Sequence, residues 1–232
     1  MDSPNYSRLV LLCSLLLVTS NSKAAEPAAK KSEWTDSFSV DKANLTSTGK
    51  NPYFNLEPGH FSQFESKDEK LVITVLDETK KVDGVETRII EEREEKDGKL
   101  IEVSRNYFAI DKTTNDLYYF GEDVDIYEDG KVINHEGSWL SGVDGAKFGL
   151  MMPGKPKAGD KFYQELAPKV AMDRCELITQ PGEFKTPAGM FKNCFATKES
   201  SPLEESISHK VYAPEVGLVQ DGEVLLTKTG KK

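Results

Sequence analysis

The chain has 232 residues, with 30 Lys and Arg against 39 Asp and Glu, which gives a formal net charge of −9. An acidic surface repels phosphate backbones, and no basic stripe is interleaved with aromatic residues. Composition therefore argues against nucleic acid as a partner. The length suits one domain of ordinary core size.

The N-terminus has the build of a secretory signal peptide. Arg8 precedes an apolar run from Leu9 to Val18, and the small residues Ser22 and Ala24 stand at −3 and −1 of a cut after Ala24. The run is shorter than the about 20 residues of a membrane span. We predict that residues 1–24 are a cleaved signal peptide, that the mature protein is secreted or periplasmic, and that it keeps no integral membrane segment. A short retained anchor is the alternative.

The next segment, residues 25–50, is rich in Ala, Lys, Ser and Thr and has little apolar periodicity. Such composition is typical of a flexible leader, with at most one short ordered segment near Trp34 to Phe38. A single β domain is predicted to span residues 51–229.

The stretch from Leu71 to Trp139 reads as a ladder of short strands joined by turns. Three turns are Asp-Gly pairs, at Asp83-Gly84, Asp97-Gly98 and Asp129-Gly130. Asp-Gly favours two-residue hairpins, in which glycine accepts a positive φ without a Cβ clash. Because such turns join only antiparallel neighbours, this half of the chain is predicted to be a meander.

Two strands of this ladder carry many polar residues. The segment from Val85 to Glu95 has charges on both faces, which predicts a solvated strand or a sheet edge. In Leu100 to Ile110 the residues alternate, with Ile101, Val103, Tyr107 and Ala109 on one face and Glu102, Ser104 and Asn106 on the other. The apolar face is the one expected to be buried.

The amino-acid composition changes at Gly137. The stretch to Asp160 holds six glycines and two prolines, which argues against a regular helix or a central strand. It also holds Trp139, Phe148, Met151 and Met152. A loop this apolar either fills a core or lines a pocket, and both interpretations stay open.

Further strands follow to the end of the chain, and no strong helix pattern occurs. Roughly ten antiparallel strands in one domain must each bury one face. The predicted fold class is all-β, an antiparallel meander that forms a curved or half-closed barrel, with a two-layer β-sandwich as the alternative.

The cysteines predict a disulfide. Cys13 lies in the signal peptide, which leaves Cys175 and Cys194 as an even count in an oxidising compartment. If their strands pair, a bridge of this loop length contributes about 3 kcal/mol. Two free buried thiols are the alternative.

Patterns for catalysis and metal binding are weak. There is no G-x-S-x-G, and the histidines His60, His135 and His209 are far apart in the sequence. The sequence thus gives no catalytic residue, metal ligand or cofactor. With so many acidic residues, a carboxylate pair for hydrolysis stays open but cannot be placed.

Aromatic and methionine side chains near the glycine-rich loop are the best candidates for ligand contact, because they suit apolar or amphipathic molecules. The predicted ligand-binding residues are Trp139, Phe148, Met151, Met152, Tyr107, Tyr118 and Tyr119.

Five motifs together resemble a family of secreted bacterial β-proteins without an assigned activity. They are NPYF.L.PG, YYFGED…Y.DGKV, GSW..GVDGAK.G..MPGKPK.GD, TPAG.F.NC and HKVYAPEVGLV, and the resemblance covers about Asn51 to Leu226. Members often carry glycine at the position of Glu215, which puts the shape of that turn in question. The layout also looks like the open-barrel lipoprotein-carrier fold, by analogy of shape alone.

Three hypotheses of function follow. The first is a secreted or periplasmic, non-catalytic protein that binds an apolar or amphipathic ligand or an envelope partner. The second is a cell-envelope hydrolase with paired carboxylates, and the third is a structural envelope protein without a small ligand.

Overall fold

The computed structural model describes residues 33–179 and 182–232, and residues 33–232 form one compact unit. The predicted all-β class is confirmed: the described part has strands and one short 3-10 helix, η1 (Lys42–Asn44), and no α-helix. Accordingly, nothing in the described ranges is a helix of the length and apolarity needed to cross a membrane. The predicted signal peptide lies outside these residues.

The chain contains more strands than the roughly ten expected, because several have only two or three residues. The first half contains β1 (Leu45–Thr46), β2 (Lys50–Asn51), β3 (Phe54–Asn55), β4 (His60–Glu65), β5 (Glu69–Val82), β6 (Val85–Lys96), β7 (Lys99–Asp111), β8 (Leu117–Glu128) and β9 (Lys131–Asn134). The second half contains β10 (Trp139–Leu140), β11 (Lys147–Met152), β12 (Lys161–Tyr163), β13 (Glu165–Leu166), β14 (Arg174–Thr179), β15 (Glu183–Thr186), β16 (Gly189–Lys192), β17 (Phe195–Ser200), β18 (Ile207–Ala213), β19 (Gly217–Asp221) and β20 (Val224–Lys231).

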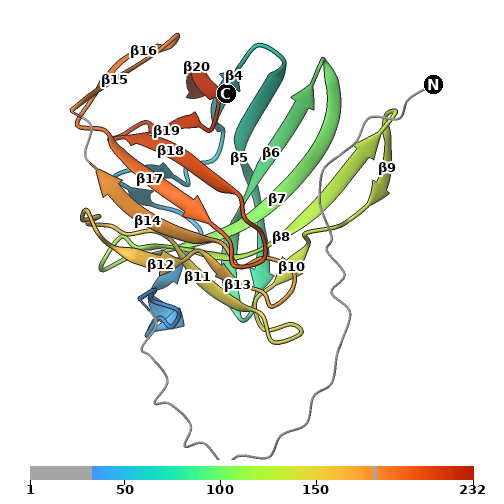
Figure 1. Ribbon diagram of the computed structural model, residues 1–232. Coiled ribbons are helices and arrows are strands. Elements are labelled where there is room, and N and C mark those ends of the chain that lie inside the picture. Colours follow the sequence, from blue (N-terminus) through green and yellow to red (C-terminus); the bar gives the residue numbers. More distant parts are fainter. Residues whose placement is uncertain (1–32, 180–181) are drawn as a thin grey trace, which may run out of the picture. The chain divides into compact units, whose positions relative to one another are not determined.

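One large antiparallel sheet curls nearly into a barrel (Figure 1). Its strand order is β12-β14-β17-β18-β19-β20-β4-β5-β6-β7-β8-β11-β13. The first and last strands of this order, β12 and β13, are separated in the chain by Gln164 alone. The two ends of the sheet therefore meet at Gln164, which confirms the expected half-closed barrel over the sandwich.

The Asp-Gly hairpins form as expected. Asp83, Asp97 and Asp129 have φ of 47°, 52° and 49°, and the glycine after each also has a positive φ. The first turn pairs Val82 with Val85, which sets the register of β5 and β6. Positive φ at both central residues matches the twist of the flanking strands.

Strand β6 does not lie at an edge, contrary to the sequence interpretation. It pairs with β5 along one side and with β7 along the other. Residues opposite each other in an antiparallel pair share a face, so Glu92 lies on the same face as its partners Ile73 and Ser104. Its charged residues are not all solvated, because this face is the interior of the barrel.

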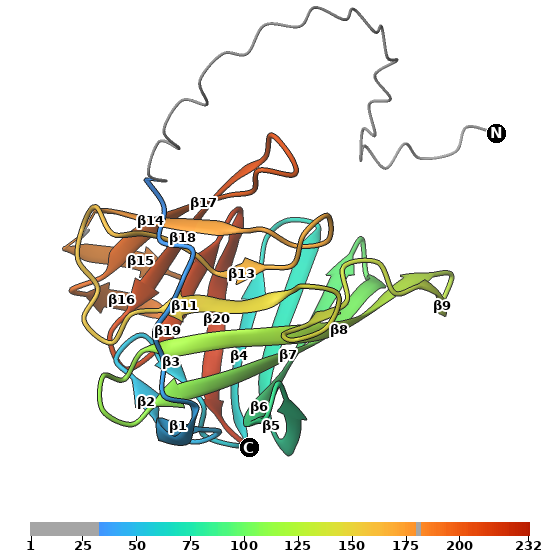
Figure 2. The same ribbon diagram turned by 90° about the horizontal axis from the view of Figure 1, so that it is seen from below.

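The N-terminal part of the domain begins earlier than residue 51. Thr35 bridges Phe162, and Leu45, which is buried, pairs with Asp111. Figure 2 shows this segment in blue, crossing from the side of β14 to β1. The described residues 33–50, expected to belong to a flexible leader, instead cover one outer face of the sheet.

Alternate residues of the strands build apolar clusters on the two faces. The first cluster fills the interior with residues such as Ile90, Phe108, Tyr119 and Trp139. Another packs outside, where the N-terminal segment covers the neighbouring positions; it contains Leu45, Val82, Val85, Tyr107, Ala109, Tyr118 and Phe120. The apolar face of β7 is buried as expected, but the polar face is turned into the barrel.

The glycine-rich stretch also departs from expectation, because β11 is a strand of the large sheet between β8 and β13. A Cβ at Gly149 would lie 2.4 Å from the carbonyl oxygen of Gln164. Glycine here permits the close approach of β11 to the segment that closes the sheet.

The predicted disulfide is not present, since Cys175 and Cys194 are both buried free thiols. Cys175 lies opposite Glu199 in the β14–β17 pair, so Cys194 is five residues further along the neighbouring strand. At about 3.3 Å per residue this offset exceeds the Cα separation of about 7 Å that a bridge tolerates. Each thiol also belongs to a different apolar cluster.

Candidate binding pocket inside the barrel

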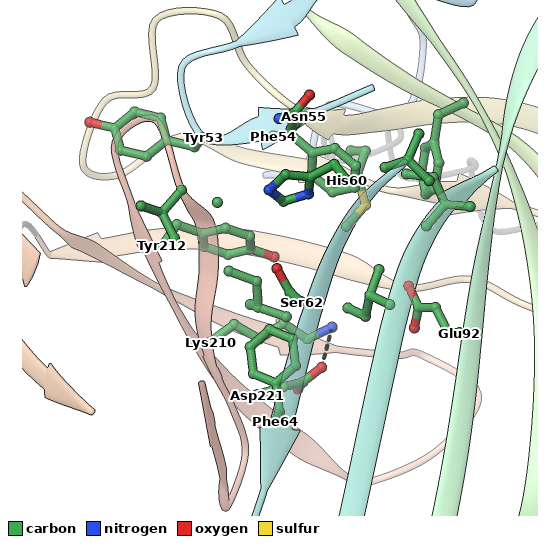
Figure 3. Close-up of a pocket in the computed structure, with 18 residues that line it drawn as sticks. Tyr53, Phe54, Asn55, His60, Ser62, Phe64, Glu92, Lys210, Tyr212 and Asp221 are labelled. Carbon is green, nitrogen blue, oxygen red and sulfur yellow. Dashed lines mark ion pairs between the residues drawn. The ribbon is translucent and has the colours of Figure 1, made fainter. Parts of the chain in front are cut away.

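A cavity of about 80 Å³ lies inside the barrel and is lined by seven strands of the large sheet and by the segment around β3 (Figure 3). One wall is apolar and comes from positions that the sheet register places on the same face. Its members include Phe54, Phe64, Ile73, Val75, Ile90, Phe108 and Leu218. Phe108 stacks on Tyr119 with ring centroids 4.8 Å apart, and this contact holds the Phe108 ring in its position beside the cavity.

The opposite wall is ionisable and centres on Lys210 of β18. Its Nζ lies 3.1 Å from Oε2 of Glu199 and 3.3 Å from Oδ2 of Asp221. Figure 3 shows the Lys210–Asp221 pair on the strands that face β4 and β6. Burial acts to lower the pKa of Lys210, but the carboxylates of Asp221 and Glu199 outweigh it and hold that pKa well above its usual value. Lys210 is therefore a charged, fully compensated group.

Glu92 of β6 faces this wall from the other side of the cavity, beside Ile73 and Ile90. Figure 3 shows its carboxyl directed toward the side of the cavity that holds Lys210. No residue in the described chain forms a hydrogen bond or ion pair with it. Burial raises the pKa of Glu92 to about 8, against the attraction of Lys210. The carboxyl is thus protonated over much of the neutral range.

A second cavity of about 220 Å³ continues the ionisable wall beyond Asp221, which borders both spaces. Glu94 lines it together with Leu71 and Val224. The pKa of Glu94 is raised to about 7, mainly by burial and then by the nearby carboxylate of Glu102. Carboxyl groups therefore lie at two alternate positions of β6, Glu92 at the first cavity and Glu94 at the second.

Polar groups also lie in the interior core around Trp139. Tyr119 donates a hydrogen bond of 2.6 Å from its hydroxyl to Oδ1 of Asn106. Burial raises the pKa of Glu122, on the same strand as Tyr119, to about 7. Side-chain hydrogen bonds from Tyr119 and Trp139 act against this rise. The interior thus combines apolar surface with buried polar groups.

The structure divides the ligand-binding residues predicted from sequence between two faces of the sheet. Trp139, Tyr119 and Met152 belong to the interior cluster, and Met151 lines the cavity. The remaining three lie in the outer cluster, away from the cavity; they are Tyr107, Tyr118 and Phe148. The seven residues therefore do not form one site.

The loop around Trp139 does border a separate cavity of about 260 Å³ at the surface. Val143 and Val170 lie on its rim, with exposed fractions of 49% and 48%. Trp139 itself is 6% exposed, so this side chain acts mainly in the interior core.

Sequence reasoning missed the residues that line the interior pocket, above all Glu92, Lys210 and Asp221. One pattern could have indicated the first: Glu92 and Glu94 alternate with Glu91, Arg93 and Glu95, so one set had to share a face with Ile90. Lys210 offered no such pattern, because it is a single lysine between His209 and Val211.

Fold and site define an all-β, half-closed barrel whose interior is apolar on one side and rich in carboxylates on the other. No family model and no curated protein matches the chain. Among solved structures, the chain is similar to a crystal structure described as a "putative lipoprotein" from Parabacteroides distasonis ATCC 8503. The identity is 12% and the TM-score 0.37, over 79% of this chain and 100% of that one. A likeness this distant carries no functional argument.

Proposed function

We propose that this protein is a non-catalytic binding protein that holds an amphipathic ligand inside the half-closed barrel. The observation that carries the proposal is the interior cavity, with Phe108 and Ile73 on one wall and Lys210 and Asp221 on the other. A ligand with an apolar body and one polar end matches both walls.

The size of the cavity limits the part of the ligand that fits. A site for one water needs about 10–15 Å³ by the same measure, so about 80 Å³ holds roughly five to eight groups of that size. An alkyl or aryl segment of about six heavy atoms is the expected occupant. A longer ligand would extend toward the cavity beside Glu94.

Titration with n-hexanol, followed by amide chemical shifts, tests the proposal. We expect saturable shifts in the strands around Ile73, Phe108 and Tyr212. Leu218→Trp fills the cavity and should abolish them. Leu203→Trp makes the same replacement at an exposed leucine and should leave them unchanged. Shifts that are absent, or that survive Leu218→Trp, would refute the binding function.

The proposal includes secretion and an association with the cell envelope, because residues 1–24 have the build of a signal peptide. Expression of the full chain in a bacterial host, followed by N-terminal sequencing of the periplasmic fraction, should find a new terminus at Ala25. Uncleaved protein in the cytoplasm would contradict this part of the proposal.

A hydrolase that uses paired carboxylates is the second candidate, and one observation favours it. Glu94 and Glu102 are opposite each other in the β6–β7 register, and the pKa of Glu94 is raised to about 7. A protonated carboxyl beside a second carboxyl is what glycoside cleavage requires. Aryl glycosides incubated with the wild-type protein and with Glu94→Gln test it, and equal background rates would discard it.

A further inference from the structure

We propose that the polar end of the ligand is a cation, an ammonium or guanidinium group, that binds between Glu92 and the ion pairs of Lys210. This inference rests on the proposed function and adds the charge class of the ligand. It is argued from the charges that line the cavity and from the position of Glu92, whose carboxyl has no hydrogen bond or ion pair in the described part of the chain.

The first step is the balance of charge around the cavity. Lys210 is the one Lys or Arg among the cavity-lining residues of the described chain, and it already has two carboxylate partners, Glu199 and Asp221. Its positive charge is therefore more than compensated before Glu92 is counted. A further cation is attracted to this wall, and an anion is repelled by it.

The second step is the state of Glu92 itself. Glu92 is half-buried in the cavity wall, and a carboxylate largely withdrawn from water without a partner is costly, so the group avoids that cost by keeping its proton. A ligand ammonium placed beside it supplies the missing partner. The carboxyl then loses its proton to solvent and forms an ion pair with the cation, so one proton is released for each cation bound near Glu92.

The apolar wall then determines the length and chemistry of the rest of the ligand. An alkylammonium about six heavy atoms long has its chain against Ile73, Val75 and Phe108 and its charge at Glu92. Neutral and anionic molecules of the same length share the apolar contacts and lack the ion pair. The comparison of three such probes therefore isolates the charge.

The experiment measures the dissociation constants of n-hexylammonium, n-hexanol and hexanoate at pH 7 by amide chemical-shift titration. We expect n-hexylammonium to bind at least about tenfold more tightly than n-hexanol, and hexanoate to bind more weakly than both. Calorimetry of n-hexylammonium in two buffers of different ionisation enthalpy should reveal proton release.

Glu92→Gln keeps the shape of the side chain and removes its charge. It should reduce the preference for the cation to less than about threefold, with the n-hexanol affinity unchanged. The matched control is Glu91→Gln, on the same strand but directed to Arg105 on the other face at 3.4 Å. It should retain the full preference and the proton release.

The possible outcomes separate the inference from the function on which it rests. Equal affinity for n-hexylammonium and n-hexanol in the wild-type protein would overturn the cation inference and leave the binding function standing. Binding by none of the three probes would overturn the binding function. If Glu92→Gln does not fold, the three-probe comparison on wild-type protein decides alone.

Discussion

Strand β6 and the stretch from Gly137 to Asp160 form an instructive contrast. The first carries so many charges that it reads as a solvated edge, and the second carries enough aromatic and apolar residues to suggest a site. In the structure β6 is central and turns Glu92 and Glu94 into the barrel. The apolar residues of the other stretch mainly complete the packing around Trp139 and Phe148.

The difference shows that alternation defines two faces of a strand but not which face is inside. An antiparallel sheet with one solvated side buries its apolar face, and interpretations of a sequence usually assume this arrangement. In a half-closed barrel both faces can be covered, one by the interior and one by chain packed outside. Tyr107 and Phe108 are both buried for this reason, although they are neighbours on β7.

The largest effect should come from Trp139→Ala, because Trp139 is 6% exposed and packs edge-to-face on Tyr119 at 5.3 Å. Truncation of a buried tryptophan costs about 3–5 kcal/mol. Chemical denaturation should show a loss of this size in the free energy of unfolding.

Trp34→Ala is the matched control for this truncation. Trp34 is only partly buried, with the guanidinium of Arg174 4.8 Å from its ring centre. A loss of about 1 kcal/mol is expected there. If Trp139→Ala cost no more than Trp34→Ala, the glycine-rich stretch would be a ligand surface and not core.

The pH dependence of stability should report Glu92. Its pKa is about 8 in the folded protein against 4.5 in the unfolded chain, so the folded state holds its proton more tightly. Stability is therefore greatest near pH 4.5 and falls as pH rises to about 8. The loss should be on the order of 3 kcal/mol, less than the full pKa difference implies because water reaches the carboxyl.

Unfolding free energies at pH 5 and pH 8 measure this loss. Glu92→Gln should make this loss smaller, whereas Glu91→Gln should leave it unchanged. Glu94 and Glu122, whose pKa values are raised to about 7, act in the same direction and keep part of the loss in both variants. If the wild-type protein became more stable from pH 5 to pH 8, the result would contradict the raised pKa values and indicate that the carboxyls of β6 are in contact with solvent.

A smaller effect is expected from Ser141→Ala at the start of the glycine-rich stretch. The Ser141 hydroxyl donates to Oδ2 of Asp83 at 2.8 Å and accepts from the backbone N–H of Phe148 at 3.1 Å. Loss of these two hydrogen bonds at a buried hydroxyl should lower the free energy of unfolding by about 1–2 kcal/mol. Ser206→Ala, at an exposed serine, should change it by less than about 0.5 kcal/mol.

The smallest effect should be a gain from Glu215→Gly. Glu215 has φ of +64°, a conformation that disfavours side chains and that glycine adopts without a Cβ clash. The thermal midpoint should rise by an amount equivalent to about 1 kcal/mol or less. Glu223→Gly, which introduces glycine at an exposed residue without positive φ, should lower it instead.

The sequence was a good guide to local structure and a poor one to the site. The Asp-Gly turns predicted the hairpins because glycine and aspartate act over two residues. The pairing of β12 and β13 with distant strands depends on contacts far apart in the chain, such as Gln164 with Glu199, and no local pattern encodes them. The cysteine prediction failed for the same reason, since register and not spacing decides which residues face each other.

The most direct test of the account is the carboxyl titration of Glu92 by side-chain ¹³C NMR, with Glu92→Gln used for assignment. If β6 turns this carboxyl into the interior, the pKa of Glu92 should be about 8. A pKa near 4.5 would mean that the carboxyl is solvated, and it would contradict both the ionisable pocket and the function proposed for it.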